Sequence, residues 1–251
     1  MCLIVFAWRP SHALPLVVAA NRDEFHARPS LPLGRWEDAP WVIGGRDLQA
    51  GGTWMGVTAD GRFAALTNIR APGQPLGLRS RGELPARFLR GELSPADYLA
   101  ELAGRCADYA GFNLLVGDRQ TLWHLNSHSG EPRALDAGIY GLSNAGLDTP
   151  WPKLRKARAA LIEALRQPQP ERLLALLADA EPAAEHELPR TGVSLEWERR
   201  LSSIFIASAA YGTRASTVLL RHADGTLELE ERSFDAHGPA GDVRYRQAPP
   251  G

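Results

Sequence analysis

The chain has 251 residues, a formal net charge of −1 and a charged-residue content of 23%. A charge balance this close to zero provides no long-range field to attract nucleic acid or an anionic membrane, so neither is an expected partner. The two cysteines, Cys2 and Cys106, provide no disulfide framework, and no apolar run reaches the roughly 18 residues of a membrane-spanning helix. We therefore expect a cytoplasmic protein, in a reducing compartment, without membrane insertion.

The chain begins with two apolar segments that predict a β-hairpin. Residues 2–8 are rich in β-branched and aromatic side chains and predict a buried strand, and residues 14–21 predict a second one. Residues 9–12 form a turn-like break between them. The hairpin would bring the polar residues 21–24 (Asn-Arg-Asp-Glu) beside Cys2. Because a β-strand does not require four polar residues there, this cluster is a candidate functional site.

The rest of the chain alternates between groups of strands and groups of helices. Further strands are expected near residues 52–58, 62–68, 112–117, 121–126, 138–142, 203–209, 216–222 and 226–231. Helices are expected near residues 80–90, 95–107, 151–166 and 170–179. Residues 181–194 are expected to form a loop. One domain covering residues 1–251 accommodates these elements, with a weakly ordered tail from about residue 235.

The grouping of helices between strands favours an α+β layered fold over a parallel α/β sheet. Ser94 is a candidate N-cap for the helix near residues 95–107, and Pro95 is a favoured first residue. Cys106 falls on the face of that helix that carries Leu99 and Leu102, so we expect it in the core.

Cys2 directly follows the initiator methionine, and its small side chain favours removal of Met1. The processed chain would carry a thiol and a free α-amine on one residue. A thiol pKa of about 8.5 and an α-amine pKa of about 7.7–8.0 allow the amine to accept the thiol's proton near neutral pH. This pairing is the basis of N-terminal nucleophile (Ntn) hydrolases. The alternative is that Cys2 is a small apolar residue at the start of a buried strand.

Six sequence blocks follow one another from residue 1 to about residue 220. They are residues 1–4 (MCLI), 19–25 (AANRDEF) with 28–29 (RP), 51–56 (GGTWMG), 64–68 (AALTN), 141–144 (GLSN) with 150–153 (PWPK), and 211–217 (YGTRAST). The set resembles the NRDE family, also called the transport and Golgi organisation protein 2 family. Six blocks in order are more specific than any one of them.

The resemblance implies the Ntn-hydrolase fold, a four-layer αββα sandwich of two antiparallel sheets with helices on both outer faces. It also implies a hydrolase, either an amidohydrolase or a thioesterase, that acts on a small acyl substrate through Cys2 and requires no cofactor. Family association implies an alternative, a non-catalytic intracellular carrier that holds haem or an acyl lipid in the same pocket. Cys2 or a histidine would then bind the haem iron.

Choloylglycine hydrolase and penicillin V acylase are the enzymes that the site resembles. By this resemblance, Cys2 is the nucleophile and Asp23 holds its α-amine. Asn144 is implied as a donor to the oxyanion, with Asn68 as a second donor. Arg214 is implied to pair with Asp23 or to anchor a substrate carboxylate.

Asn21, Arg22 and Glu24 complete the expected set as substrate-binding residues. The hydrolases carry an Arg-Asn-x-Asp pattern at this strand, and Ala20 stands at the position of their arginine. Arg22 is therefore the candidate to replace that arginine from a different direction. A structural alternative is a salt bridge between Arg22 and Asp23 at the strand end.

Other motifs also have structural interpretations. Asn144 can be a turn residue and Asn68 can satisfy loop backbone groups. Residues 51–54 (GGTW) favour a tight entry into a strand. His124 and His128 are four residues apart but lie in a strand and turn, so we expect no metal site.

Overall fold

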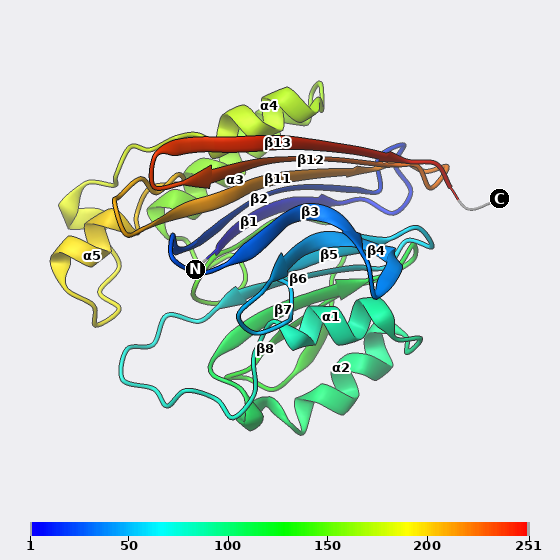
Figure 1. Cartoon of the computed structure of the whole chain (residues 1–251), viewed down its shortest axis with the longest axis horizontal. Coiled ribbons are helices and arrows are strands. Elements are labelled where there is room, and N and C mark those ends of the chain that lie inside the picture. The colour runs from blue at the N-terminus through cyan, green and yellow to red at the C-terminus, as the bar shows by residue number, and fades with distance from the viewer. Residues whose placement is uncertain (1, 250–251) are drawn as a thin grey trace.

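The computed structural model describes residues 2–249, which form two antiparallel sheets packed face to face (Figure 1). The first sheet has the order β10-β1-β2-β11-β12-β13. Its strands are Cys2–Trp8 (β1), Leu16–Phe25 (β2), Gly138–Leu142 (β10), Tyr211–Arg221 (β11), Leu227–Asp235 (β12) and Gly238–Gln247 (β13). The second sheet runs in sequence order from β3 to β9. Its strands are Ser30–Trp36 (β3), Ala39–Asp47 (β4), Met55–Thr58 (β5), Phe63–Asn68 (β6), Phe112–Gly117 (β7), Leu122–Asn126 (β8) and Pro132–Ala134 (β9).

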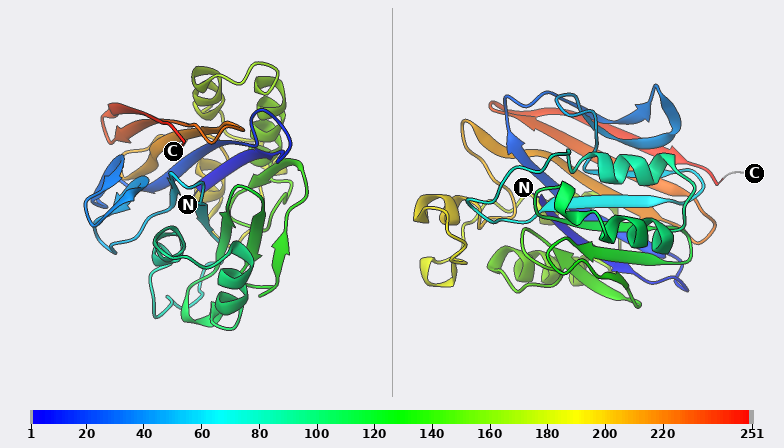
Figure 2. Two further views of the ribbon diagram at one scale, coloured as in Figure 1. Left: turned by 90° about the vertical axis from the view of Figure 1, so that its right-hand side faces the viewer. Right: turned by 90° about the horizontal axis from the view of Figure 1, so that it is seen from below.

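Helices cover the outer face of each sheet. The helices α3 (Pro152–Ala164) and α4 (Pro170–Leu177) pack on the first sheet, α3 against β10 and β1 and α4 against β11 and β2. The helices α1 (Glu83–Arg90) and α2 (Pro95–Ala103) pack on the second sheet, and α5 (Leu195–Arg200) lies at one end of the molecule. Figure 2 shows the two helix layers on opposite sides of the sheets. The predicted α+β sandwich is confirmed.

The alternation of side chains along β1 divides this strand between two cores. Cys2, Ile4 and Phe6 belong to the core between the sheets, whereas Leu3 and Val5 belong to the core beneath α3 and α4. Because β1 is buried on both faces, it reads in the sequence as a continuous apolar run.

The N-terminal hairpin forms as the sequence predicts. Cys2 lies directly opposite Arg22, and Leu3 lies opposite Asn21. The strand β2 continues through the four polar residues to Phe25, and its other edge pairs with β11. The prediction that this cluster lies beside Cys2 is therefore confirmed.

Single residues determine where α2 begins and how closely α3 approaches the sheet. Ser94 caps α2, because its side chain accepts a hydrogen bond from the backbone N–H of Asp97 at 3.1 Å. Gly141 on β10 allows α3 to approach closely, since a Cβ at this position would lie 2.8 Å from the side chain of Leu154. This contact fixes the first turn of α3 against the sheet.

The secondary structure differs from expectation in several places. The sequence did not indicate β3 and β4, whose patterns are interrupted by Pro32, Gly34 and Gly44. Residues 203–209 form no strand; the backbone N–H of Ile206 instead donates to the side chain of Thr213 at 2.9 Å. This segment is a loop that side chains hold in place.

The tail also differs from expectation. The chain after residue 235 forms β13, which pairs with β12 along the edge of the first sheet. Its side chains are mostly exposed, so the strand lacks the apolar alternation that would have revealed it. In addition, α2 ends at Ala103, and Cys106 lies half-buried in the 3-10 turn Cys106–Asp108 rather than in the helix.

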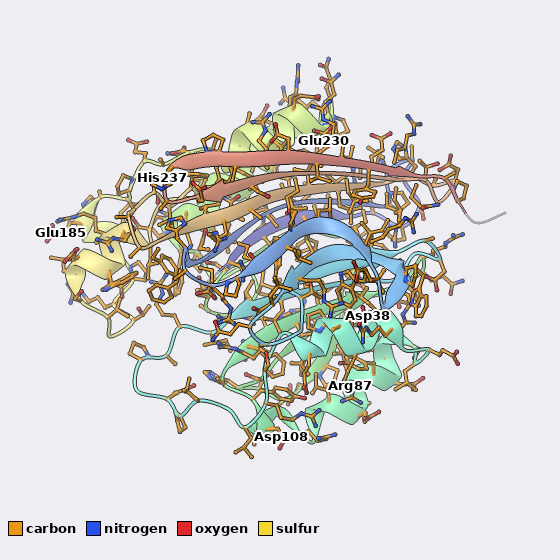
Figure 3. All side chains as sticks on the ribbon, viewed as in Figure 1. Asp38, Arg87, Asp108, Glu185, Glu230 and His237 are labelled. Carbon is orange, nitrogen blue, oxygen red and sulfur yellow. The ribbon has the colours of Figure 1, made fainter. Side chains whose placement is uncertain are left out.

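Charged side chains are distributed over several faces of the molecule. In Figure 3, Asp38 and Arg87 lie near α1 and Glu185 lies near α5. Glu230 lies on the face of the first sheet that points away from the second sheet. No helix within residues 2–249 is long and apolar enough to cross a membrane.

Candidate functional site

A cavity of about 760 Å³ lies beside Cys2. Its walls come from β2, β12 and β13 of the first sheet, from β3 and β4 of the second, and from the loop between β6 and α1. The volume lies within the range of sites that bind small molecules. Of the eight residues proposed from the sequence, six line this cavity: Cys2, Arg22, Asp23, Glu24, Asn68 and Arg214.

The thiol of Cys2 is almost fully buried, with a residue exposure of 6%. Burial raises the pKa of the thiol, and the nearby carboxylates of Asp23 and Glu24 raise it further, while Arg22 acts in the opposite direction. The thiol is therefore protonated at neutral pH and needs a base to become a nucleophile. Met1, whose removal would supply the α-amine as that base, lies outside the described residues.

Arg22 presents its guanidinium to the cavity. It shares a face of β2 with Ala20, which is buried between the sheets, and it lies opposite Cys2. Ala20 lies opposite Ile4, two residues before Arg22 on the same face of β2, so Arg22 is closer to the thiol than Ala20 is. Among residues 2–249, the guanidinium of Arg22 has no side-chain hydrogen bond or ion pair, so the structural alternative of a salt bridge to Asp23 is not formed.

The carboxylate of Asp23 is held from β11. Thr213 donates a hydrogen bond from its hydroxyl to Oδ1 of Asp23 at 2.8 Å, and the hydroxyl of Tyr211 donates to the backbone carbonyl of Asp23 at 3.1 Å. Burial raises the pKa of this carboxyl group, and the positive charge of Lys153 opposes that effect. Asp23 is therefore fixed in position at the strand end next to Cys2.

The two asparagines contact each other, but only one of them lines the cavity. Nδ2 of Asn144 donates to the backbone carbonyl of Asn68 at 2.8 Å, and Asn144 is 1% exposed. Among the described residues, Asn68 borders the cavity and Asn144 does not. The order of the two candidates is therefore reversed: Asn68 can reach a bound molecule, and Asn144 supports the loop that carries it.

A buried polar network lies behind the asparagines. Thr67 donates to the carbonyl of Ser143 at 2.6 Å, and Asn113 donates to Thr67 at 3.2 Å and to the carbonyl of Ala145 at 2.6 Å. His124 joins the network through Oδ1 of Asn113 at 3.2 Å. Burial, assisted by the charge of Arg133, lowers the pKa of His124 to about 4, so the imidazole is neutral and donates to this oxygen.

Asn21 does not contact the cavity, contrary to the prediction. Its Nδ2 donates to the carbonyls of Leu177 and Ile204, both at 2.9 Å, and its Oδ1 accepts from Ser216 at 2.7 Å. These bonds lie on the face of β2 that packs against α4. Asn21 therefore joins the sheet to the helix layer.

Arg214 reaches the cavity, but its guanidinium is occupied by the backbone. It donates to the carbonyls of Phe25, His26 and Arg28 at 3.0–3.1 Å and to that of Phe234 at 3.1 Å. It therefore holds the turn after β2 rather than pairing with Asp23. Glu24 accepts a bond from the N–H of Phe25 at 2.9 Å.

Sequence reasoning missed three charged residues near Cys2. Arg81, which precedes α1, donates to the carbonyl of Gly111 at 3.1 Å and faces the cavity. Glu231 on β12 accepts from the N–H of Leu33 on the opposite sheet at 2.7 Å. Lys153 lies in the first turn of α3 and is 3% exposed. The block of residues 150–153 was a signal for Lys153, whereas nothing in the sequence distinguishes Arg81 and Glu231 from surface charges.

Within the described part of the chain, no group of three or more His, Cys, Asp or Glu side chains is arranged to hold a metal ion.

Comparisons with known proteins identify relatives and a fold. Residues 1–236 match the family model described as Transport and Golgi organisation 2. The Transport and Golgi organization 2 homolog of Mus musculus is 34% identical over 257 residues, covering 93% of both chains. Transport and Golgi organization protein 2 of Drosophila melanogaster is 27% identical over 270 residues, covering 96% of this chain and 95% of that protein.

Two solved structures share the architecture. A mutant of conjugated bile acid hydrolase from Clostridium perfringens matches with a TM-score of 0.55 at 7% identity, covering 97% of this chain and 92% of that one. The Caenorhabditis elegans orthologue of N-acylethanolamine-hydrolyzing acid amidase matches with a TM-score of 0.50 at 11% identity, covering 87% and 92%. The chain therefore has an Ntn-hydrolase-like fold.

Proposed function

Because the chain belongs to the transport and Golgi organisation 2 family and has an Ntn-hydrolase-like fold, we propose that it is a cysteine hydrolase of small acyl substrates. The bond cleaved is an amide or a thioester. The observation that carries this proposal is the position of Cys2, at the start of β1, facing Arg22 across the register and opening on a cavity of about 760 Å³. The free thiols of Cys2 and Cys106 support a location in the cytoplasm.

The chemistry requires that Cys2 be the first residue of the processed chain. The α-amine takes the thiol proton while the sulfur attacks the substrate carbonyl, so that a C–S bond forms and an oxyanion develops. The ammonium then returns the proton to the leaving amine or thiol as its bond to the acyl carbon breaks. Water hydrolyses the acyl thioester, with the amine again accepting a proton, and the released acid leaves Cys2 as a free thiol.

Asn68 is the residue that we assign to the oxyanion. Its side chain borders the cavity, and its backbone carbonyl is fixed by Asn144 at 2.8 Å. A positioned amide donor lowers the energy of the developing charge because it needs no reorganisation during the reaction. Asn144 then acts through Asn68, supported by Thr67 and Asn113.

The cavity favours an anionic substrate with an apolar part. Several of its arginines are already paired; Arg28, for example, binds Asp47 at 2.6 Å. Arg22 and Arg81 keep donors available on the cavity side, and both lie within electrostatic range of Cys2. Exposed leucines, including Leu76 and Leu78, stand at the rim. A carboxylate or phosphate near the arginines, with an acyl chain toward the rim, fits this distribution.

Turnover by the processed protein tests the proposal. A panel of acyl amides and acyl thioesters, with and without a carboxylate, would be incubated with the wild type, Cys2→Ser and Cys106→Ala. We expect hydrolysis by the wild type and by Cys106→Ala, and at least a hundredfold loss in Cys2→Ser. Undiminished turnover in Cys2→Ser would contradict the assignment.

A second candidate function is an intracellular carrier of haem or an acyl lipid. Its supporting observation is the raised pKa of the Cys2 thiol, which leaves a poor nucleophile wherever the α-amine is blocked. Cargo would occupy the same cavity, with Cys2 available to haem iron. Saturable binding of haem or acyl lipid by a chain that hydrolyses no acyl substrate would favour the carrier.

A further inference from the structure

Lys153 is a buried cation that the site so far does not explain. It is 3% exposed, and its Nζ has no hydrogen-bond partner within residues 2–249. The sequence contains one other lysine, Lys156. The side chain of Lys156 is exposed and pairs with Asp179 at 2.6 Å and with Glu181 at 2.9 Å. Burying an ammonium is costly unless an opposite charge lies nearby, so a neighbouring group must compensate the charge of Lys153.

The compensating charge is the carboxylate of Asp23. Of the charged groups around Lys153, Asp23 favours the ammonium form most strongly, and Lys153 is in turn the strongest stabiliser of the Asp23 carboxylate among the described side chains. Burial nevertheless lowers the pKa of Lys153 to about 8. The ammonium therefore predominates at neutral pH, and it shares a low-dielectric environment with a carboxylate beside Cys2.

Asp23 borders the cavity, but its carboxylate is directed to the other face of the sheet, where it accepts from Thr213. Cys2 and Arg22 are directly opposite each other and point to the cavity. Asn21 points the other way, into the helix layer, and Asp23 alternates to the same side as Asn21. The α3 helix that carries Lys153 packs on that side. The part of Cys2 that lies between the two faces is its backbone nitrogen, which is the α-amine in the processed chain.

We propose that Lys153 is a positioning residue that acts through Asp23: its positive charge offsets the Asp23 carboxylate and so keeps the α-amine of processed Cys2 neutral and able to accept the thiol proton. The inference rests on the proposed function. A carboxylate that acted on the amine alone would stabilise the ammonium form, which cannot accept a proton. Lysine suits this role because its compact ammonium fits at the end of a flexible stem, whereas a guanidinium is broad and planar.

The other charged side chains around the thiol and the amine are the same in the wild type and in a variant that lacks only Lys153. Arg22, Glu24 and Arg81 lie near the thiol, and Arg70 lies near Lys153. Tyr211 donates to the carbonyl of Asp23 and stays neutral, because burial raises the pKa of its hydroxyl. A change in the amine on substitution of the lysine alone therefore reports the lysine.

The small number of cysteines makes the amine directly observable. The protein would be released from a fusion by a protease that leaves Cys2 first, so that the test does not depend on cellular processing. With carbon-13 cysteine, the resonances of Cys2 follow its amine and thiol, and Cys106 serves as the internal reference. The titration compares the wild type with Lys153→Met, Asp23→Asn, the double variant, and Lys156→Met as a control on the same helix.

We expect Lys153→Met to raise the pKa of the amine, reducing the neutral fraction at pH 7 about tenfold. Lys156→Met should leave it unchanged, and Asp23→Asn should lower it. In the Asp23→Asn background, Lys153→Met should have a much smaller effect. An unchanged amine pKa in folded Lys153→Met would overturn the proposal, as would an equal effect with and without Asp23.

A second titration covers the case in which Lys153→Met does not fold. Carbon-13 lysine gives two signals in the wild type, one for each lysine. Lys153 should titrate at lower pH than Lys156, and Asp23→Asn should lower its midpoint further. Coincident titration of the two lysines contradicts the proposal. Neither titration uses a substrate, so a failure to find hydrolysis would count against the proposed function and leave these results interpretable.

Discussion

The paired positions of Cys2 and Arg22 bring a thiol and a guanidinium to one wall of the cavity, and this guanidinium has no ion-pair partner among residues 2–249. Several arginines elsewhere on the wall are already engaged; Arg79, for example, binds Glu83 at 2.6 Å. A cavity-facing cation without a protein partner is available to a ligand anion. Arg22 is therefore the side chain that we expect to select substrates by charge.

Substitution of Arg22 tests this selection directly. In Arg22→Gln, the alkylation rate of Cys2 by a carboxylated electrophile should fall about tenfold or more relative to an uncharged electrophile of similar size, since a hydrogen bond to a charged group contributes roughly 1.5–3 kcal/mol. Arg79→Gln, at the rim, should retain the wild-type ratio. Mass spectrometry after timed labelling measures both rates. Equal ratios in all three proteins would contradict a role for Arg22 in anion recognition.

Individual site residues were predictable only where the hairpin register controls their position. The polar run after an apolar strand identified residues 21–24, and the register brought Arg22 beside Cys2. The direction of each side chain depends on which face of β2 meets the cavity, which the sequence does not specify. For this reason Asn21 was misplaced. That Asn68 rather than Asn144 lines the cavity was not predictable either, because the contact between them joins segments that are 76 residues apart in the chain.

At the scale of single elements, β2 combines two functions on its alternating faces. Arg22 faces the cavity, while Asn21 bonds to the carbonyl of Leu177 at the end of α4 and to that of Ile204. The same strand therefore positions the site and anchors the helix layer. The apolar segment 203–209 forms a loop whose backbone bonds to the carbonyl of Asp179, to the side-chain amide of Asn21, and to both the hydroxyl and the backbone N–H of Thr213.

Loss of the Asn21 anchor should reduce stability without altering the cavity. Asn21→Ala leaves the carbonyls of Leu177 and Ile204 and the hydroxyl of Ser216 without this partner, so we expect the free energy of unfolding to fall by about 2–3 kcal/mol. Ser216→Ala, which removes one of these bonds, should cost about 1 kcal/mol. Urea unfolding measures both. A loss in Asn21→Ala no larger than in Ser216→Ala would show that the carbonyl bonds contribute nothing.

The accuracy of the predicted elements follows the burial of each strand. Residues 2–8, 112–117 and 138–142 were predicted with the bounds that β1, β7 and β10 have. The first two are buried throughout, and their apolar runs leave little ambiguity. In contrast, β3 and β13 expose much of their length, so neither carries the alternating apolar pattern that marks a strand.

For the molecule as a whole, one buried histidine links stability to pH. His124 joins β8 to the network that supports the loop after β10, and its pKa is lowered to about 4 by burial. Between pH 6.5 and about 4, the unfolded chain binds a proton at this residue that the folded chain does not. The stability that the neutral imidazole provides is therefore present above pH 6.5 and is lost as the pH falls.

The size of this effect can be measured by comparison with His124→Gln, which removes the titrating group. Between pH 7.5 and pH 5, the wild type should lose about 2 kcal/mol more of its free energy of unfolding than the variant. Urea unfolding across this pH range gives both curves. Parallel curves for the two proteins would show that His124 does not titrate differently in the folded and unfolded states.

The two sheets, their helix layers and the cavity at the end of β2 define a molecule built like an Ntn hydrolase, and the family match extends over residues 1–236. Sequence blocks were sufficient to identify the family and its fold, because they lie in the buried strands and tight turns on which the fold depends. The chemistry depends on a few charges around Cys2, and folds outlast activities.

The acyl-enzyme itself is the most direct test of the central claim. The native protein, as purified, would be mixed with a slowly hydrolysed acyl thioester, quenched in acid within seconds, and mapped by mass spectrometry. We predict that Met1 is absent and that one acyl group is attached to Cys2, with none on Cys106, and that the adduct disappears as free acid forms. Retention of Met1 in the native protein, or the absence of any adduct on Cys2 while acid is released, would contradict the account.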